Sequence, residues 1–479
     1  MIRPSGNPTT INKPTAFASI GGMRVALSAF NVNYSVGSVA RAMIGMAVED
    51  LEKFDDSDPD SIVEVEIFGK KAFVGYVDSD AFSVSGDNIT SSVILVHKAR
   101  DLDESSLFSP GSHPASTEDF SIRMAFQADE STGPSGADKV LSRRDIQFDL
   151  TGNIGKEVVK YVTSVMNHLV VSSSLRNLPA NLQSAQQTIS EQAPKVLAAM
   201  KEIVVHGDCK MGVSGDIGAL QDAAAAFARN MALGAMGTGK SPWSVLAGLM
   251  SAFGLTIICL PDGRAIITPD YAGCTPPREN TLEASIISRF STSSSKTRPP
   301  SAVLAVAYGI SSGNEINPVG FSPVVSFTPK IRPSATSGVY TTGLPGWMVP
   351  VSRTSQSNPP PTIPEFLGES WAKQIYYQIA NINRTMQVTV PYTPGIIPGT
   401  VYKVIPTSSV RFMSGGSAGV SKSFSGYCHS VTHSLTPDSN DISTSLVFRN
   451  IFKDGESEAM VQGAPLFKDQ SPFSSLYQG

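Results

Sequence analysis

The clearest chemical motif in the sequence is a phosphate-binding pattern at residues 234–241, which read GAMGTGKS and match G-x-x-x-x-G-K-[ST]. In a working site of this type, backbone N–H groups surround the phosphates of a nucleotide. The lysine and the hydroxyl then meet the γ-phosphate and Mg²⁺. The pattern therefore offers a candidate nucleotide site. Its defining residues are Gly234, Gly239, Lys240 and Ser241.

The surroundings of this motif favour a different structure. A nucleotide-binding loop follows a buried strand, whereas residues 221–233 are rich in alanine and have the period of a helix. Ser241 followed by Pro242 is a typical helix start, with the serine as N-cap. The first carboxylate after a plausible strand, Asp262, lies in a Pro-Asp-Gly turn and is badly placed to hold Mg²⁺. We expect a helix-to-helix connection and no cofactor, and we keep nucleotide binding as an alternative.

Histidine and cysteine side chains do not form a convincing metal site. His429 and His433, next to Cys428, would share one face of a strand two steps apart, a long spacing for binding one ion. His206 and Cys209 could supply two ligands, but no second pair is evident, and structural zinc sites normally use four ligands. We predict no bound metal.

Composition restricts the function further. The chain has 479 residues with 41 acidic and 37 basic side chains, a formal net charge of −4 that argues against a general nucleic-acid binder. Only 16% of residues are charged, against roughly 25% in an average globular protein. Uncharged polar residues or neighbouring chains must therefore cover much of the surface. With no G-x-S-x-G elbow and no other catalytic arrangement, we expect a protein that is not an enzyme.

Further features concern compartment and membranes. We expect no secretory signal, because the start of the chain is polar and broken by prolines, and no membrane-spanning helix, because the sequence has no run of ~18 apolar residues. The four cysteines show no CxxC spacing, so reduced thiols are expected.

The hydrophobic pattern predicts a mainly β protein with α+β parts. Residues 23–100 alternate with period two, a helical period follows a long loop, and alternation returns after residue 385. A helix at 242–253 precedes a hairpin whose turn is residues 261–264. We expect two antiparallel β-barrels around an α+β module. The expected domains are 1–102 (first barrel with an N-terminal arm), 103–240 (loop and helical insertion), 241–365 (α+β module), 366–452 (second barrel) and 453–479 (C-terminal arm).

Three separated pieces of the chain resemble phage tail baseplate hub proteins of the late-control protein D type, which are related to the hub part of type VI secretion spikes. The long insertion 103–235 departs from that pattern. The pieces that carry the resemblance are FVGYVD (73–78), SVSGD (83–87) and 92–102 for the first barrel, 243–265 for the module, and QVTVP (387–391), IPGTV (397–401), GYCHSVTH (426–433) and TSLVFR (444–449) for the second barrel.

This resemblance implies an architectural function. The two barrels per chain would be tube-like, and three chains would form a ring with pseudo-sixfold symmetry. The ring would join a sixfold tail tube to a threefold central spike in a contractile phage tail or related injection machine. It implies the tail tube protein and the spike protein as partners, and a place in the tail baseplate of the virion after assembly in the host cytoplasm. The choice of a further partner for the helices at 150–235 stays open between a baseplate wedge protein and a tape-measure protein.

A third hypothesis remains beside the hub and the nucleotide-binding protein. Ser/Thr/Gly-rich β proteins often serve as adhesins, so the chain could be a receptor- or glycan-binding protein at the periphery of a tail. Placement on the tail axis or away from it distinguishes this hypothesis from the hub.

Overall fold

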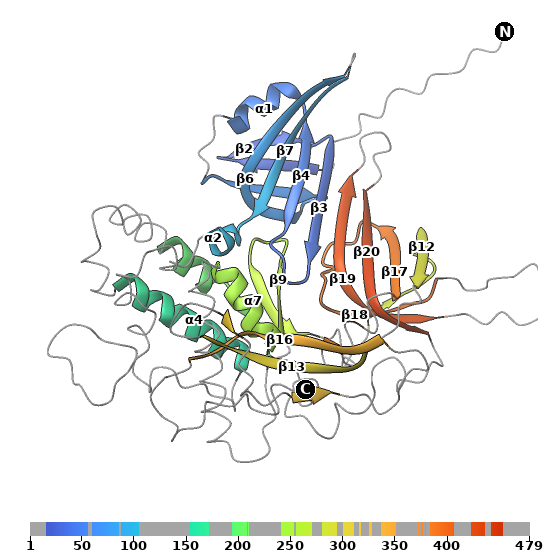
Figure 1. Ribbon diagram of the computed structural model, residues 1–479. Helices are drawn as coiled ribbons and strands as arrows, with labels where there is room; N and C mark the ends of the chain where they lie inside the picture. Colours follow the sequence, from blue (N-terminus) through green and yellow to red (C-terminus); the bar gives the residue numbers. More distant parts are fainter. Residues whose placement is uncertain are drawn as a thin grey trace, which may run out of the picture.

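The structure is a computed structural model in which two β-barrels lie side by side above a layer of helices and smaller sheets (Figure 1). The first barrel is blue in the figure, and the second is orange and red with β12 in yellow. The residues that the structure describes are 16–55, 60–85, 88–104, 153–171, 194–207, 209, 241–252, 255–270, 280–294, 300–310, 316–317, 325–327, 337–350, 372, 375, 376, 379, 384–406, 423–435 and 442–453.

The first barrel is built from consecutive strands near the N-terminus, all paired antiparallel in the order β2-β1-β5-β6-β7-β4-β3. Alternating residues point inward, as the period-two pattern predicts. The elements are β1 (Ala16–Ile20), β2 (Met23–Ala26), β3 (Ala29–Ser35), β4 (Arg41–Met46), α1 (Val48–Asp55), β5 (Ile62–Ile67), β6 (Lys70–Ser85), β7 (Asn88–His97) and α2 (Arg100–Asp103).

This barrel closes because β2 and β3 are the two halves of one bent strand. Only Leu27 and Ser28 separate them. The N–H of Leu27 donates to the carbonyl of Ala16 (3.0 Å), and the N–H of Ser28 donates to the carbonyl of Gly45 (2.9 Å). The bent strand thus pairs with β1 along its first half and with β4 along its second, which joins the two ends of the sheet.

The second barrel repeats this plan with strands in the order β11-β18-β19-β20-β17-β12. Again the closing strand is split. The N–H of Ser288 donates to the carbonyl of Thr389 (2.8 Å), and the N–H of Ile405 donates to the carbonyl of Leu282 (2.9 Å). The strands are β11 (Asn280–Leu282), β12 (Arg289–Ser294), β17 (Arg384–Pro391), β18 (Val401–Val404), β19 (Phe424–Leu435) and β20 (Ile442–Lys453).

The expectation of a mainly β fold with two barrels is confirmed. The pairing adds a difference in the second barrel: β11 and β12 belong to its sheet, although the sequence pattern put them in the module at 241–365. Closure needs strands on both sides of the β17–β20 sheet, and the described residues between 384 and 453 supply only four. The domain boundaries themselves stay a prediction.

A separate four-stranded sheet lies in the chain between β12 and β17. Its long strands β13 and β16 pair in parallel and run beneath both barrels in Figure 1. The strands are β13 (Pro300–Ile310), β14 (Ile316–Asn317), β15 (Val325–Phe327) and β16 (Ser337–Pro350).

The α+β module consists of a hairpin, one parallel strand and packed helices. Its strand order is β8-β10-β9, and the turn at residues 261–264 is the one that the sequence predicts. Residues 194–201 are also helical. The other elements are α4 (Ile154–Val171), β8 (Val204–Val205), α7 (Pro242–Ala252), β9 (Leu255–Cys259) and β10 (Ala265–Pro269).

The module meets one end of each barrel. In the first barrel, the β3–β4 turn is held at Gly37, whose N–H donates to the carbonyl of Ile257 (2.9 Å) and whose carbonyl accepts from the Trp243 indole (3.0 Å). In the second barrel, Gly399 lies so close to Ile258 that a Cβ at this position would collide with that side chain. The same hairpin therefore positions both barrels.

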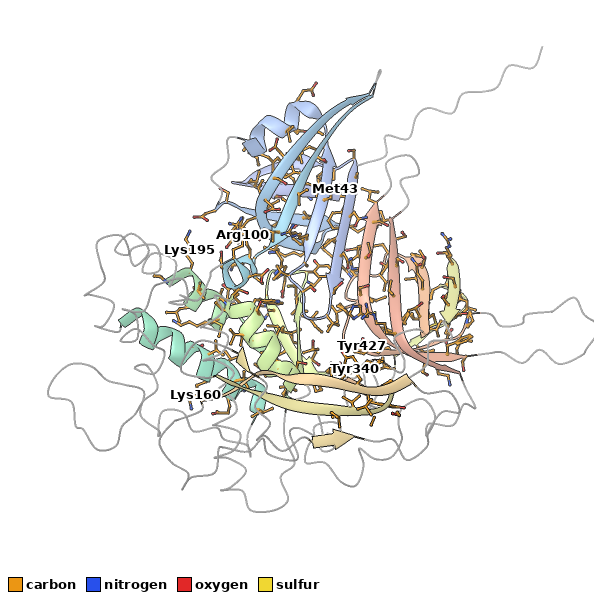
Figure 2. The ribbon with its side chains drawn as sticks, viewed as in Figure 1. Met43, Arg100, Lys160, Lys195, Tyr340 and Tyr427 are labelled. Carbon is orange, nitrogen blue, oxygen red and sulfur yellow. The ribbon has the colours of Figure 1, made fainter. Side chains whose placement is uncertain are left out.

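The first barrel also contacts the helices beneath it through ion pairs. Arg100 and Lys195, both labelled in Figure 2, each approach Asp60, at 3.9 and 2.6 Å respectively. Lys195 is the main reason that the pKa of Asp60 is lowered. Because Lys195 and Asp60 are more than half exposed, their pair adds little stability.

Five strands of one barrel can be aligned with five strands of the other. In each, a long hairpin carries a one-residue bulge on its first strand, at Asp78 in β6 and at His429 in β19. We aligned the two bulges and followed the strand pairings around each barrel. The counterparts are β3 and β12, β4 and β17, β5 and β18, β6 and β19, and β7 and β20. This alignment places Gly75, Tyr76 and Phe30 on Gly426, Tyr427 and Phe290.

Candidate functional site

The phosphate-binding motif is described only at its last residue, since Gly234, Gly239 and Lys240 lie outside the described residues. The Ser241 hydroxyl accepts a hydrogen bond from the N–H of Ser244 (3.2 Å), the geometry of a helix N-cap, and donates to Asp103 (3.1 Å). Asp262 is bonded within its own turn by Arg264, with side-chain distances of 2.6 and 2.8 Å. Ser241 therefore acts as the N-cap of the helix that follows it, and Asp262 stabilises its own turn; the expected helix before the motif lies outside the described residues.

His97 has a structural role between the first barrel and the module. His97 accepts from the N–H of Ala99 (3.1 Å) and so donates from Nε2 to the carbonyl of Leu260 (2.9 Å), which ties the first barrel to the module hairpin. Burial lowers the pKa of His97 to about 4. Within the described ranges, no three His, Cys, Asp or Glu side chains gather as a metal site requires.

The bulge at His429 separates the two residues that the sequence pattern put on one face. His429 is partly exposed, whereas His433 is buried. A bulge adds one residue to the strand and so shifts its alternation, which is why the period-two argument fails at this point. In the described geometry, His429 and His433 therefore do not face one common metal ion.

The feature that unites the molecule is a seam between the barrels, formed where β19 changes partner. Its first half pairs with β18 and its second half pairs with β3, antiparallel. The N–H of Val36 donates to the carbonyl of His429 (3.1 Å) and extends the pairing to the bulge. Through this seam the described strands of both barrels form one 13-stranded sheet. The paired residues are Phe30–Leu435, Asn31–Ser434, Val32–His433, Asn33–Thr432, Tyr34–Val431 and Ser35–Ser430.

Aromatic side chains fill the inner side of the seam. The His433 ring lies edge-on to Tyr34 and Tyr392, with centroids 6.2 and 5.3 Å away. Its Nδ1 lies 2.9 Å from the hydroxyl of Thr444, and the Tyr34 hydroxyl donates to the carbonyl of Ala72 (2.6 Å). Burial lowers the pKa of His433 to about 4 and raises that of Tyr34, so both are neutral at pH 7. The seam is thus held by uncharged contacts.

Sequence reasoning considered His433 as a metal ligand and as part of the second-barrel segment 426–433, and it did not single out Tyr34 or Tyr392. These residues come from distant parts of the chain, and no local pattern reports which strand edges will meet. The bulged hairpins are the one signal that could have led to them, since both contain a Gly-Tyr pair before an alternating run.

The seam joins two different edges in a fixed orientation. Strand β3 runs antiparallel to β19 across the seam and also antiparallel to β6 within its own barrel, through β4 and β7. Because β6 is the counterpart of β19, the two barrels point the same way. The β3 edge of the first barrel therefore meets the β19 edge of the second, and these two edges are not counterparts. Such a contact between different surfaces is heterologous.

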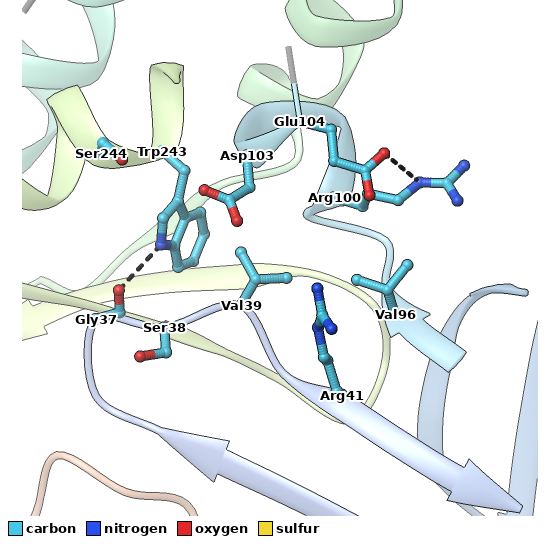
Figure 3. A pocket seen from close by; sticks show the side chains of 10 residues that line it. All are labelled: Gly37, Ser38, Val39, Arg41, Val96, Arg100, Asp103, Glu104, Trp243 and Ser244. Atoms are coloured by element: carbon cyan, nitrogen blue, oxygen red, sulfur yellow. Dashed lines mark hydrogen bonds and ion pairs between the residues drawn. The ribbon is translucent and has the colours of Figure 1, made fainter. Parts of the chain in front are cut away.

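A cavity of about 340 Å³ lies beside this region, between the β3–β4 turn, α2 and the start of α7 (Figure 3). Figure 3 shows Arg41, Arg100, Asp103 and Glu104 around it, with Arg100 paired to Glu104 at 3.3 Å. The Arg100 guanidinium also lies over the Tyr76 ring, 4.5 Å from its centroid. Charges of both signs line the cavity, so it is not specialised for an anion.

Comparison with solved structures finds tail proteins. The chain is similar to a tail protein from Neisseria meningitidis MC58 (11% identity, 94% of this chain and 98% of that one, TM-score 0.48) and to the 43 kDa tail protein of prophage MuSo2 from Shewanella oneidensis (13%, 91% and 97%, 0.46). It is also similar to an E. coli component of the type VI secretion system described as resembling T4 tail proteins gp27 and gp5 (9%, 93% and 80%, 0.37). The sequence resemblance likewise concerns a phage tail protein related to type VI secretion spikes.

No protein-family model and no curated protein matches the sequence. Of the helices within the described ranges, none combines the length and the apolar character needed to cross a bilayer.

Proposed function

We propose that this chain is the structural hub of the baseplate in a contractile phage tail or a related injection machine. Three copies form a ring with pseudo-sixfold symmetry that joins the tail tube to the central spike. The observation that carries the proposal is the pair of matching barrels, which point the same way and are joined edge to edge in one sheet.

The orientation of the barrels supports a ring. A heterologous contact that repeats generates either a closed ring or a helical filament, unlike a twofold contact, which ends at a dimer. Each chain already contains two successive barrels related by such a contact. Three chains then supply six barrels, so one face of the ring matches a sixfold tube while the ring itself keeps the threefold symmetry of a spike.

Other properties suit this architectural role. The low fraction of charged residues, 16%, is compatible with large obligate interfaces, which commonly bury ~2,000 Å² or more. The sequence resemblance supplies the particle and the partners: the tail tube protein, the spike protein, and a wedge or tape-measure protein as further candidates. The proposed hub acts by assembly, without a catalytic step or a cofactor, in the tail of the virion.

The mass of the purified full chain tests the ring. Light scattering after size exclusion is expected to give three times 50.7 kDa, about 152 kDa. Averaged images of the particle should then show three copies, with six barrels around the tail axis. A chain that remains a monomer at every concentration would contradict the ring, and copies placed away from the axis would favour the receptor-binding hypothesis.

A further inference from the structure

We propose that neighbouring copies of this chain join through a second seam, in which β12 of one copy pairs antiparallel with the second half of β6 of the next. The register is that of the internal seam between β3 and β19. This inference rests on the proposed ring and specifies which edges hold it together. The two edges are residues 79–85, named the β6 edge, and residues 289–294, named the β12 edge.

Both edges lack a partner strand in the described part of the chain. Strand β5 pairs with β6 only as far as Tyr76, and beyond the bulge the β6 edge pairs on one side with β7. The β12 edge pairs with β17 on one side and is the end of the sheet on the other. An unpaired strand edge presents free N–H and C=O groups and is a template for another chain.

The internal seam shows what such edges bind. Residues 430–435 of β19 are the counterparts of residues 79–84 of β6, because both follow the bulge. Strand β3 is the counterpart of β12, because both pair with the strand before the long hairpin. Within one chain, a β3 edge binds a β19 edge. The two edges that remain are one of each kind, at opposite ends of the two-barrel sheet, as a repeating contact requires.

The register follows from the alignment of the barrels. The internal seam places Asn31 opposite Ser434, and their counterparts are Ser291 and Ser83. The bond from Val36 to His429 marks the hydrogen-bonded pairs of the seam, and Asn31–Ser434 falls on a non-hydrogen-bonded position. The pairs expected between copies are Phe290–Val84, Ser291–Ser83, Thr292–Phe82, Ser293–Ala81 and Ser294–Asp80.

Side chains on β12 are more exposed than their counterparts on β3. This difference is expected if β12 lacks the neighbouring strand that covers β3. Val32 is completely buried beside β19, whereas its counterpart Thr292 is exposed. Phe30 is 1% exposed, and its counterpart Phe290 is only partly buried. Residues 290–294 carry no charge, and Asp80 is the one charged residue among the five expected opposite them. The contact therefore takes few ions out of water.

Cysteine pairs in the full-length chain test the seam. The double variant Ser83→Cys/Ser291→Cys places two thiols at a non-hydrogen-bonded pair, where Cα atoms approach within disulfide range. Mild oxidation is expected to produce covalent dimers and trimers on a non-reducing gel. The wild-type chain, whose Cys209, Cys259 and Cys428 are buried, gives the background.

Two matched variants control for reactivity and register. Asn31→Cys/Ser434→Cys pairs across the internal seam and is expected to form a disulfide within one chain, detected by peptide mass and without covalent oligomers. Ser83→Cys/Ser293→Cys sets the thiols on a diagonal, and its yield should be roughly tenfold lower because the diagonal Cα separation exceeds disulfide geometry.

The outcomes separate this seam from the ring. A trimer by mass in which the 31/434 disulfide forms but the 83/291 disulfide does not overturns the seam and leaves the ring standing. Covalent dimers from Ser291→Cys alone, equal in yield to the double variant, indicate that two β12 edges meet about a twofold axis and also overturn it. A monomer at all concentrations overturns ring and seam together.

Discussion

The two barrels share one pairing plan but differ in how the chain supplies it. The first is a continuous stretch of chain with six strand positions, including β1. Within the described residues, the second has no counterpart of β1, so β11 pairs directly with β18 and the pairing becomes parallel. Neighbouring strands alternate in direction in an antiparallel order, so removing one strand brings together two strands that run the same way. The plan of hydrogen bonds is therefore what the two barrels have in common, while few side chains are the same.

Their surroundings differ as well. The core of the first barrel continues into the module, through residues such as Trp243 and Ile257. The second barrel has a separate core around Val388, Tyr402 and Phe448. The β3 edge of the first barrel is covered within the chain, whereas the β12 edge of the second is open in the described structure. The comparison shows that the β3 edge is paired within the chain, whereas the equivalent β12 edge is free to pair with another copy.

The largest effect is expected where the first barrel has no room for a side chain. A Cβ at Gly75 would collide with the backbone carbonyl of Val96 in the paired strand. We expect Gly75→Ala to lower the free energy of unfolding by at least ~3 kcal/mol, because backbone must move, as measured by urea titration. Gly338→Ala is the control, since nothing lies within 4 Å of its added Cβ. Equal stability of the two variants would contradict this expectation.

Phenylalanines at matching positions test the difference between the covered and open edges. Phe30→Ala empties a buried site and should cost about 3–5 kcal/mol. Phe290→Ala removes a partly exposed ring and should cost less than roughly half of that in the unassembled chain. Urea titration at protein concentrations below assembly measures both. Similar losses for the two variants would mean that the β12 edge is already covered within a single chain.

Acid should weaken the seam through His433. Burial holds its pKa at about 4, whereas an unfolded histidine has a pKa near 6.5. The stability contributed by the neutral ring is complete above pH ~6.5 and is lost as pH falls toward 4, since the unfolded state then binds the proton more tightly. The loss should be about 2 kcal/mol at pH 5.

The comparison for this pH effect is His433→Gln, which removes the titrating group. Its drop in unfolding free energy between pH 7.5 and pH 5 should be smaller than that of the wild type by roughly the same 2 kcal/mol. His97 contributes a similar slope in the first barrel and remains in both proteins. Identical slopes for variant and wild type would exclude a neutral, buried His433.

The smallest expected effect concerns the module beneath the barrels. Ser241→Ala removes the N-cap of α7 and should cost about 1 kcal/mol, while Ser241→Asn should restore most of it. Thermal unfolding measures both. Titration with ATP–Mg²⁺ is expected to show no binding in either the wild type or Lys240→Ala. Binding that Lys240→Ala abolishes would support the nucleotide alternative instead.

Much of the local structure followed from the sequence. The alternation at Val63–Ile67 indicated β5, and Ser241-Pro242 marked the start of α7. The β9–β10 hairpin and the strands β17, β18, β19 and β20 also lie where period two predicted them. These elements could be predicted because their signals come from residues that are neighbours in the chain.

The seam and the closure of the barrels could not be predicted in this way. Amino-acid pattern alone established that the chain would form short, apolar strands with turns between them, since side-chain period and turn chemistry are local. Three-dimensional packing determined that β11 and β12 complete the second barrel, that His433 lies between Tyr34 and Tyr392, and that β19 divides its edge between two partners. The reason is physical: backbone N–H and C=O groups are alike in every residue, so the strand that satisfies them depends on which edges the fold brings within reach.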